Sequence, residues 1–196
     1  DTDAFVAGHA STAVSTALGM ARARTLLKQD YHVIALMGDG AMTGGVAYEG
    51  MNDAGESNEP LIVILNDNGM SITPNVGGIA KHLGLLRTRP GYFRLKKAYR
   101  TVTCKLPGGK AVYRMTHRLK ERWKRMLLGC TLFEEMGFEY YGPVDGHDLR
   151  RLEYMLRLVK DCKRPVLLHV ITQKGRGYRP AELNPDVFHG IGSFDP

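Results

Sequence analysis

Val33-Ile-Ala-Leu-Met-Gly-Asp-Gly40 and Leu61-Ile-Val-Ile-Leu-Asn-Asp-Asn68 share one pattern, an apolar run followed at once by a small polar triplet. Short apolar runs that are rich in β-branched residues and bounded by Gly and Asn are typical of buried strands in a parallel sheet. Residues 46–54 lie between the two runs and predict the helix of a right-handed crossover. We therefore expect an α/β fold.

The two polar triplets are expected to meet at the carboxyl edge of neighbouring strands, where open α/β sheets bind ligands. Asp39 and Asn68 would offer hard oxygen ligands there, of the kind that Mg²⁺ and Ca²⁺ take. Gly40 and Ala41 are expected to open a helix, and the free N–H groups of a helix start attract anions. The arrangement suits a metal-bridged diphosphate, although Gly-Asp-Gly alone is also an ordinary turn sequence.

The remaining sequence continues the alternation of helices and strands. Residues 11–28 predict a helix with Ser11 or Thr12 as its N-cap. The segment 71–84 contains Pro and Gly and is expected to be an active-site loop. Further along, we expect a strand at 137–141, a turn at 142–146, a helix at 149–163 capped by Asp148, and a strand at 166–171. This order predicts a doubly wound, mostly parallel sheet with helices on both faces.

Length and composition are those of a single domain. A chain of 196 residues is long enough for one sizeable core, and no apolar run approaches the ~20 residues of a membrane span. Because the chain begins at Asp1 rather than at Met, we expect residues 1–196 to be one domain of a longer protein. Cys104, Cys130 and Cys162 are scattered without metal-ligand spacing, which argues for a reducing compartment.

Positive charge is concentrated in residues 81–125, which contain fifteen Lys and Arg residues and one acidic residue, Glu121. Such a run predicts a solvated, flexible insertion, although it could also steer anionic molecules toward a site. A nucleic-acid-binding module is an alternative. We do not expect a nucleic-acid partner, because such modules usually interleave aromatic residues with the basic ones.

Further segments add to the two polar triplets. They are Gly8-His-Ala-Ser-Thr12, Asn66-Asp-Asn-Gly-Met-Ser-Ile72, Gly142-Pro-Val-Asp-Gly-His147, Gln173-Lys-Gly-Arg-Gly-Tyr178 and Phe188-His-Gly190. Gly-Asp-Gly with a downstream Asn resembles the thiamine-diphosphate motif. The complete set resembles the amino-terminal domain of the 1-deoxy-D-xylulose-5-phosphate synthase family, which is related to transketolase.

The resemblance implies a transferase that uses thiamine diphosphate and Mg²⁺. Its substrates would be pyruvate and glyceraldehyde 3-phosphate, which condense with loss of CO₂ to give a precursor for isoprenoid and thiamine synthesis. It also implies a homodimer in the cytoplasm, or in the plastid stroma of a plant or alga, with no membrane partner. Transketolase and the 2-oxo-acid dehydrogenases share the Gly-Asp-Gly and Asn elements and are alternatives, but they fit residues 66–72 and 174–178 poorly.

The resemblance also implies roles for individual residues. Mg²⁺ would be bound by Asp39, by the side chain of Asn68 and by the backbone carbonyl of Met70. The cofactor would be bound by Gly8, His9, Ala10, Gly40, Ala41, Asn68, Lys174 and Tyr178. His9 and His189 would act in catalysis, although each histidine by itself could equally be an ordinary loop residue.

Other groups are expected to be structural or to lie elsewhere. His169 is expected to be a hydrogen-bonded core residue, and His147 is expected to shape a turn. In the family, the glutamate that activates the cofactor belongs to a further domain, and two more histidines precede the segment that starts here. Residues 1–196 alone are therefore expected to be inactive.

Overall fold

The structure is a computed structural model that describes residues 3–6, 8–71, 75–87 and 132–193. Within these residues, four strands form one sheet in the order β1-β2-β4-β3, and all neighbouring strands are parallel. They are β1 (Ile34–Gly38), β2 (Ile62–Asp67), β3 (Glu139–Asp145) and β4 (Val166–Ile171). The predicted α/β fold with a parallel sheet is confirmed.

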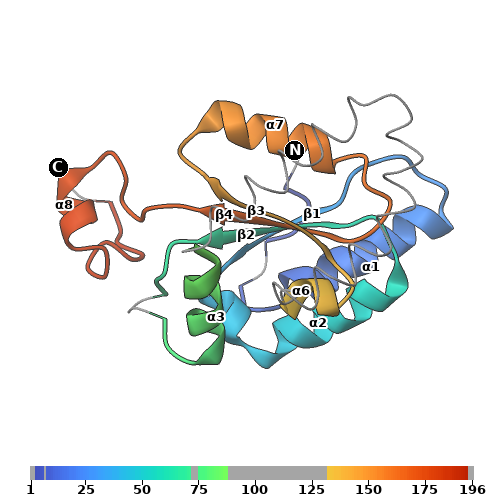
Figure 1. Ribbon diagram of the computed structural model, residues 1–196, viewed down its shortest axis with the longest axis horizontal. Coiled ribbons are helices and arrows are strands. Elements are labelled where there is room, and N and C mark those ends of the chain that lie inside the picture. Colours follow the sequence, from blue (N-terminus) through green and yellow to red (C-terminus); the bar gives the residue numbers. More distant parts are fainter. Residues whose placement is uncertain (1–2, 7, 72–74, 88–131, 194–196) are drawn as a thin grey trace, which may run out of the picture.

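Helices cover both faces of the sheet (Figure 1). One face carries α1 (Ala13–Leu26), α2 (Gly45–Ser57), α3 (Gly78–Arg87) and α6 (Leu132–Glu135), which share the largest apolar core with the strands. The other face carries α7 (Leu149–Val159), whose apolar side chains pack against Val144, Leu168 and Val170. The short helix α8 (Arg179–Leu183) lies beyond the carboxyl ends of the strands.

The ends of two helices differ slightly from expectation. Asp148 caps α7 as predicted, because its side chain accepts a hydrogen bond from the Arg151 N–H (3.1 Å), but the helix ends at Val159 rather than at residue 163. Helix α1 begins after Thr12, which makes no side-chain cap. Ser11 instead has a left-handed backbone (φ 73°), and its hydroxyl donates to the Ala41 carbonyl oxygen (2.6 Å). Thr12 therefore holds the predicted N-cap position without a capping side-chain hydrogen bond, and Ser11 links the start of the helix to the segment after β1.

The expected turn at 142–146 is wrong, because β3 continues through these residues to Asp145. A register shift between Tyr141 and Val144 absorbs Pro143, which has no N–H for the strand ladder. Gly142 has a φ of 125°, and a Cβ at this position would lie 2.5 Å from the His169 carbonyl oxygen. A bulge with glycine at the close approach thus turns a predicted turn sequence into strand.

The expected loop at 71–84 is wrong in its second half, which belongs to α3. Leu83 and Leu86 of this helix are buried in the main core, so tertiary packing stabilises a segment whose glycines suggested a loop. Helix α3 also includes the first residues of the predicted basic insertion, from 81 to 87. The rest of that insertion, residues 88–125, lies outside the described residues.

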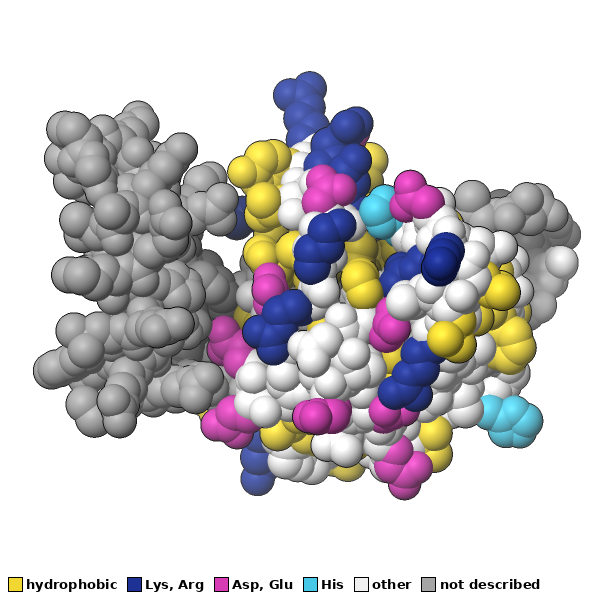
Figure 2. Space-filling view, turned by 90° about the vertical axis from the view of Figure 1, so that its right-hand side faces the viewer, with side chains coloured by type: hydrophobic (Ala, Val, Ile, Leu, Met, Phe, Trp, Pro, Cys, Tyr) yellow, Lys and Arg dark blue, Asp and Glu magenta, His cyan; other side chains and the backbone are white. Residues whose placement is uncertain are grey.

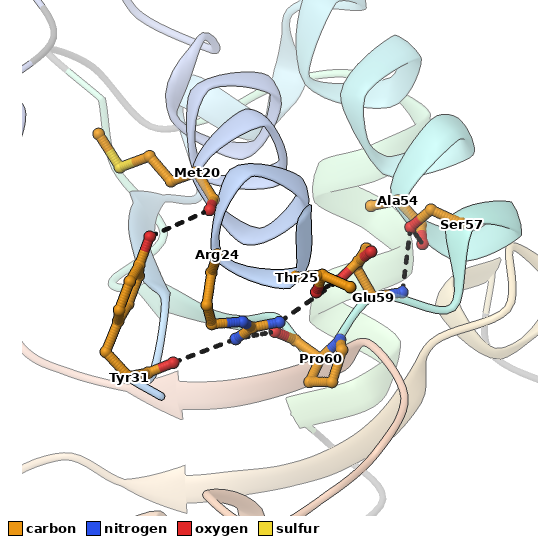
Figure 3. Close-up of polar contacts among 8 residues, drawn as sticks. All are labelled: Met20, Arg24, Thr25, Tyr31, Ala54, Ser57, Glu59 and Pro60. Carbon is orange, nitrogen blue, oxygen red and sulfur yellow. Dashed lines mark hydrogen bonds and ion pairs between the residues drawn. The ribbon is translucent and has the colours of Figure 1, made fainter. Parts of the chain in front are cut away.

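A buried arginine holds the amino ends of β1 and β2 against α1 (Figure 3). The Arg24 guanidinium donates to the carbonyl oxygens of Tyr31 (3.2 Å) and Pro60 (3.0 Å) and forms an ion pair with Glu59 (3.4 Å). Because a buried cation is costly unless it is paired, these acceptors explain how Arg24 is tolerated with only 7% exposure. The contacts fix the end of the sheet that is opposite the polar triplets.

On the side of the molecule at these amino ends, basic and acidic side chains are interspersed rather than segregated by sign (Figure 2). Within the part of the chain that the structure describes, no helix is both long enough and apolar enough to cross a membrane. Asp39 and Asn68 lie at the opposite end of the sheet, where β1 and β2 finish.

Candidate cofactor and metal site

The two polar triplets meet at the carboxyl edge of β1 and β2, as predicted. Gly38 is the register partner of Asn66, and the Asp39 N–H donates to the Asn66 carbonyl oxygen (3.1 Å). Parallel pairing of the two strands therefore brings their last residues side by side. The loop after β1 and the loop after β2 therefore both begin at this edge of the sheet.

Asp39 is a buried acceptor at this edge. The residue is 1% exposed, and its carboxylate accepts hydrogen bonds from the backbone N–H groups of Gly40 (3.0 Å) and Gly69 (2.7 Å). Burial, together with a hydrogen bond to the Asp67 carboxyl group, raises the pKa of Asp39 to about 6, although the two N–H donors oppose this shift. A divalent cation would supply the positive charge that this buried pair of carboxyl groups lacks.

Asn68 and Met70 lie in one tight turn directly after β2. The Asn68 Oδ1 atom accepts a hydrogen bond from the Met70 N–H (2.9 Å), which orients the amide beside Asp39 through the intervening Gly69. No cluster of three or more His, Cys, Asp or Glu side chains occurs among the described residues. One carboxylate with an amide and a carbonyl oxygen nevertheless fits Mg²⁺, which usually takes one or two protein carboxylates and completes its shell with phosphate and water.

The chain packs tightly where Gly40 passes the segment after β2. A Cβ atom on Gly40 would lie 2.7 Å from the Cβ of Ser71, closer than real Cβ atoms approach. Gly40 and Ala41 open a helix as predicted, but it is a short 3-10 helix, Ala41–Thr43, and the α-helix α2 begins only at Gly45. The Gly40 N–H is already engaged by Asp39, so it stabilises the carboxylate in this structure.

Lys174 reaches the same edge from the loop after β4. Its ammonium group donates to the Ser71 carbonyl oxygen (3.2 Å) and contacts the Nδ1 atom of His189. Because an ammonium has only donors, His189 Nδ1 must be the acceptor, which leaves the proton of the neutral ring on Nε2. The structure thus brings two residues that the resemblance singled out, Lys174 and His189, into direct contact beside Ser71.

The other residues singled out lie on two further segments, the start of α8 and the segment before α1. Tyr178 is partly exposed and packs edge-on against Phe188, with ring centroids 5.8 Å apart. Gly8, His9 and Ala10 are exposed in the segment before α1, and the His9 carbonyl oxygen accepts a hydrogen bond from Thr12 (3.0 Å). This segment is tied to the edge through the hydrogen bond from Ser11 to Ala41.

Two other histidines behave as expected. His169 is fully buried and hydrogen-bonded through both ring nitrogens, to Tyr140 (2.7 Å) and to Asp67 (2.8 Å). His147 shapes a turn: its N–H donates to Asp145 (2.9 Å) and its Nε2 atom accepts from the Gln173 N–H (2.9 Å).

Sequence reasoning missed Asp67 and Tyr140 as neighbours of the site. Asp67 stood inside the quoted motif, but its partner across the sheet is 102 positions away, and no local pattern marks such a pair. A histidine in the middle of the apolar run 166–171 was the available signal, because a buried imidazole requires hydrogen-bonding partners.

Comparison with known proteins identifies relatives of this chain. A family model described as 1-deoxy-D-xylulose-5-phosphate synthase matches residues 1–172. The enzyme of that name from Pelotomaculum thermopropionicum is 52% identical over 193 residues, which are 98% of this chain and 30% of the relative. The one from Clostridium tetani is 49% identical over 194 residues, again 98% of this chain and 31% of the relative.

The chain thus spans about a third of the length of the curated relatives that it matches. Among solved structures, a transketolase from Campylobacter jejuni aligns with a TM-score of 0.49 and 21% identity, over 85% of this chain and 20% of that one. A likeness of that degree adds nothing to the assignment.

Proposed function

Because this chain belongs to the 1-deoxy-D-xylulose-5-phosphate synthase family, we propose that it forms the part of such an enzyme that binds Mg²⁺ and the diphosphate of thiamine diphosphate. The whole enzyme would join pyruvate to glyceraldehyde 3-phosphate with loss of CO₂. One observation carries the proposal: Asp39 at the end of β1 is buried and held by the Gly69 N–H after β2, beside Asn68. The Gly-Asp-Gly and Asn-Asp-Asn halves of the proposed diphosphate-metal motif thereby lie next to each other.

In this proposal Asp39, Asn68 and the Met70 carbonyl oxygen hold Mg²⁺. The two backbone donors on Asp39 fix its orientation, so little conformational freedom is lost when the metal binds. Gly40 and Ala41 lie against the diphosphate, and the absence of a Cβ at Gly40 lets the chain pass close to Ser71. Thiamine diphosphate supplies the electron sink for decarboxylation, and the protein supplies position and charge.

Lys174 is proposed to pair with the diphosphate. Its ammonium group lies beside Ser71, the residue that follows Met70. A cation there offsets the phosphate charge that one Mg²⁺ leaves unbalanced. His189 contacts Lys174 and would present its Nε2–H group to the substrate side. His9 and Tyr178 are proposed to lie near the reacting end of the cofactor, where an imidazole can stabilise developing negative charge.

Product identification in the whole protein tests this function. With pyruvate, glyceraldehyde 3-phosphate, Mg²⁺ and thiamine diphosphate, we expect 1-deoxy-D-xylulose 5-phosphate and CO₂. Transfer of a two-carbon unit between sugar phosphates, with no use of pyruvate, would instead indicate a transketolase. Residues 1–196 alone should bind the cofactor weakly and release no CO₂ from labelled pyruvate, because the family's activating glutamate belongs to a further domain.

We also propose that the whole protein is a homodimer in the cytoplasm, as the family resemblance implies. Light scattering on the purified protein would give the mass directly. A monomer that retains full activity would contradict the dimer.

A further inference from the structure

A chain of buried hydrogen bonds leads from Asp39 into the core. The Tyr140 hydroxyl lies 2.7 Å from His169 Nδ1, and His169 Nε2 lies 2.8 Å from Asp67 Oδ2. Asp67 in turn lies beside Asp39, because the residues before them, Asn66 and Gly38, are register partners on β2 and β1. Tyr140 belongs to β3, His169 to β4 and Asp67 to β2, and Asp39 follows β1, so the chain crosses the sheet in the order of its strands.

All members of this chain are shielded from water. Asp67 and His169 are 0% exposed, Asp39 is 1% exposed and Tyr140 is 4% exposed. Burying polar groups inside an apolar core is costly unless each of them finds a partner. Apolar side chains of the same volume would often give the core equal or greater stability. Stability alone therefore does not account for this set of residues.

The direction of donation follows from the chemistry of the groups. An ionised Asp67 carboxylate has only acceptors, so His169 Nε2 carries the ring proton and donates to Asp67 Oδ2. Nδ1 is then the acceptor of the ring, and the Tyr140 hydroxyl, whose pKa burial raises far above its usual range, donates to it. Each donor therefore has one acceptor, and Asp67 is held in place from the core side.

The Asp39 carboxylate is consequently fixed from two directions. The Gly40 and Gly69 N–H groups hold it from the loop side, and Asp67 lies beside it at the end of the neighbouring strand. Partners that orient a metal ligand from behind commonly change metal affinity when they are removed. If His169 were lost, Asp67 would lose the hydrogen bond from Nε2, and the support on one side of Asp39 would weaken with it.

We propose that Tyr140, His169 and Asp67 are positioning residues that hold the Asp39 carboxylate in the orientation in which it binds Mg²⁺ and the cofactor's diphosphate. The proposal rests on the proposed function, because it assigns these residues to that same site. It predicts that a defect in the buried chain lowers metal affinity, whereas an equally damaging defect elsewhere in the core does not.

Calorimetry on the whole protein tests this by measuring the Mg²⁺ concentration for half-maximal binding of thiamine diphosphate. His169→Leu keeps the volume but removes both hydrogen bonds, and it should raise that concentration about tenfold to hundredfold. His169→Gln offers an amide that can donate to Asp67 and accept from Tyr140, so it should stay within about threefold of the wild type. Tyr140→Phe should fall between the two.

The matched control is Val63→Ala, because Val63 is fully buried in the same apolar core on β2 and has no polar link to Asp39. It should lower the melting temperature and leave the Mg²⁺ dependence unchanged. Equal Mg²⁺ dependence of His169→Leu and the wild type would overturn the inference, as would a loss in Val63→Ala as large as that in His169→Leu.

If His169→Leu does not fold, Tyr140→Phe and Asp67→Asn take its place, and unchanged Mg²⁺ dependence in both would equally overturn the inference. Failure of the proposed function is distinguishable, because the wild-type protein itself would then show no Mg²⁺-dependent binding of thiamine diphosphate. In that case both the function and the inference fall.

Discussion

The Asp39 carboxylate accepts a hydrogen bond from the Gly69 N–H at 2.7 Å, although the two residues are 30 positions apart in the chain. The contact joins the loop after β1 to the loop after β2 and places a buried carboxylate beside the turn that contains Asn68 and Met70.

Asp39→Ala should abolish Mg²⁺-dependent binding of thiamine diphosphate in the whole protein, because it removes the charged oxygen ligand of the site. Titration calorimetry with and without Mg²⁺ measures this directly. Asp53→Ala is the matched control, since it also removes an aspartate, but one that lies on the surface and pairs with Arg22. Mg²⁺-dependent affinity that survives in Asp39→Ala would remove Asp39 from the metal site.

The raised pKa of Asp39, about 6 against an ordinary value of 3.8, makes the metal-free stability depend on pH. The folded state favours the protonated carboxyl, so this stabilisation is present below pH 3.8 and is lost as the pH rises through about 6. Asp39→Asn cannot titrate. Its stability relative to the wild type should therefore increase by up to about 3 kcal/mol between pH 4 and pH 7.

Denaturant unfolding of the metal-free wild type and of Asp39→Asn at several pH values gives this difference. Comparing the two proteins at each pH cancels the titration of the groups that do not interact with Asp39. A difference that stays constant between pH 4 and pH 7 would show that Asp39 has an ordinary pKa. Mg²⁺ should stabilise the wild type more at pH 7 than at pH 5, because metal binding requires the ionised carboxylate.

Gly40→Ala should lower cofactor affinity, by roughly tenfold, because the new Cβ would lie 2.7 Å from the Ser71 Cβ and force the two loops apart. The double variant with Ser71→Gly removes the nearest atom and should restore part of the affinity. Gly45→Ala is the control, because no atom lies within 4 Å of a Cβ at that position, and it should leave binding unchanged. Equal behaviour of the two alanine variants would argue against the close approach.

Lys174→Met should weaken thiamine diphosphate binding about tenfold to hundredfold, the range expected for a lost hydrogen bond to a charged group. The salt dependence of binding should also become smaller, because one screened charge interaction is gone. Lys160→Met removes an exposed lysine at the end of α7, on the other face of the sheet, and should change neither quantity. An unchanged affinity in Lys174→Met would place the diphosphate elsewhere.

Local pattern was sufficient for the strands that are apolar along their length. The runs 33–37, 61–65 and 166–171 each coincide with a strand of the sheet, because β-branched and aliphatic residues between polar breakers favour a buried strand whatever its neighbours are. The same holds for Asp39 and Asn68: each follows its strand directly, and parallel strands end at a common edge.

Where packing outweighs local preference, the sequence was misleading. Gly142 and Pro143 resemble a turn but lie within β3, because a bulge beside His169 accommodates them. Helix α3 carries glycines that indicated a loop, yet the burial of Leu83 and Leu86 stabilises it as a helix. In both cases the stabilising contacts come from other elements, so a window of neighbouring residues does not contain them.

The amino-acid sequence by itself determined the α/β class, the end-of-strand position of Asp39 and the family to which the chain belongs. Only the tertiary structure decided that Asp67, His169 and Tyr140 stand in line behind Asp39, because that line requires the strand order β1-β2-β4-β3. His169 and Asp67 are 102 positions apart in sequence. They meet because His169 is the register partner of Leu65 on the adjacent parallel strand, and Asp67, two residues beyond Leu65, has its side chain on the same face of the sheet.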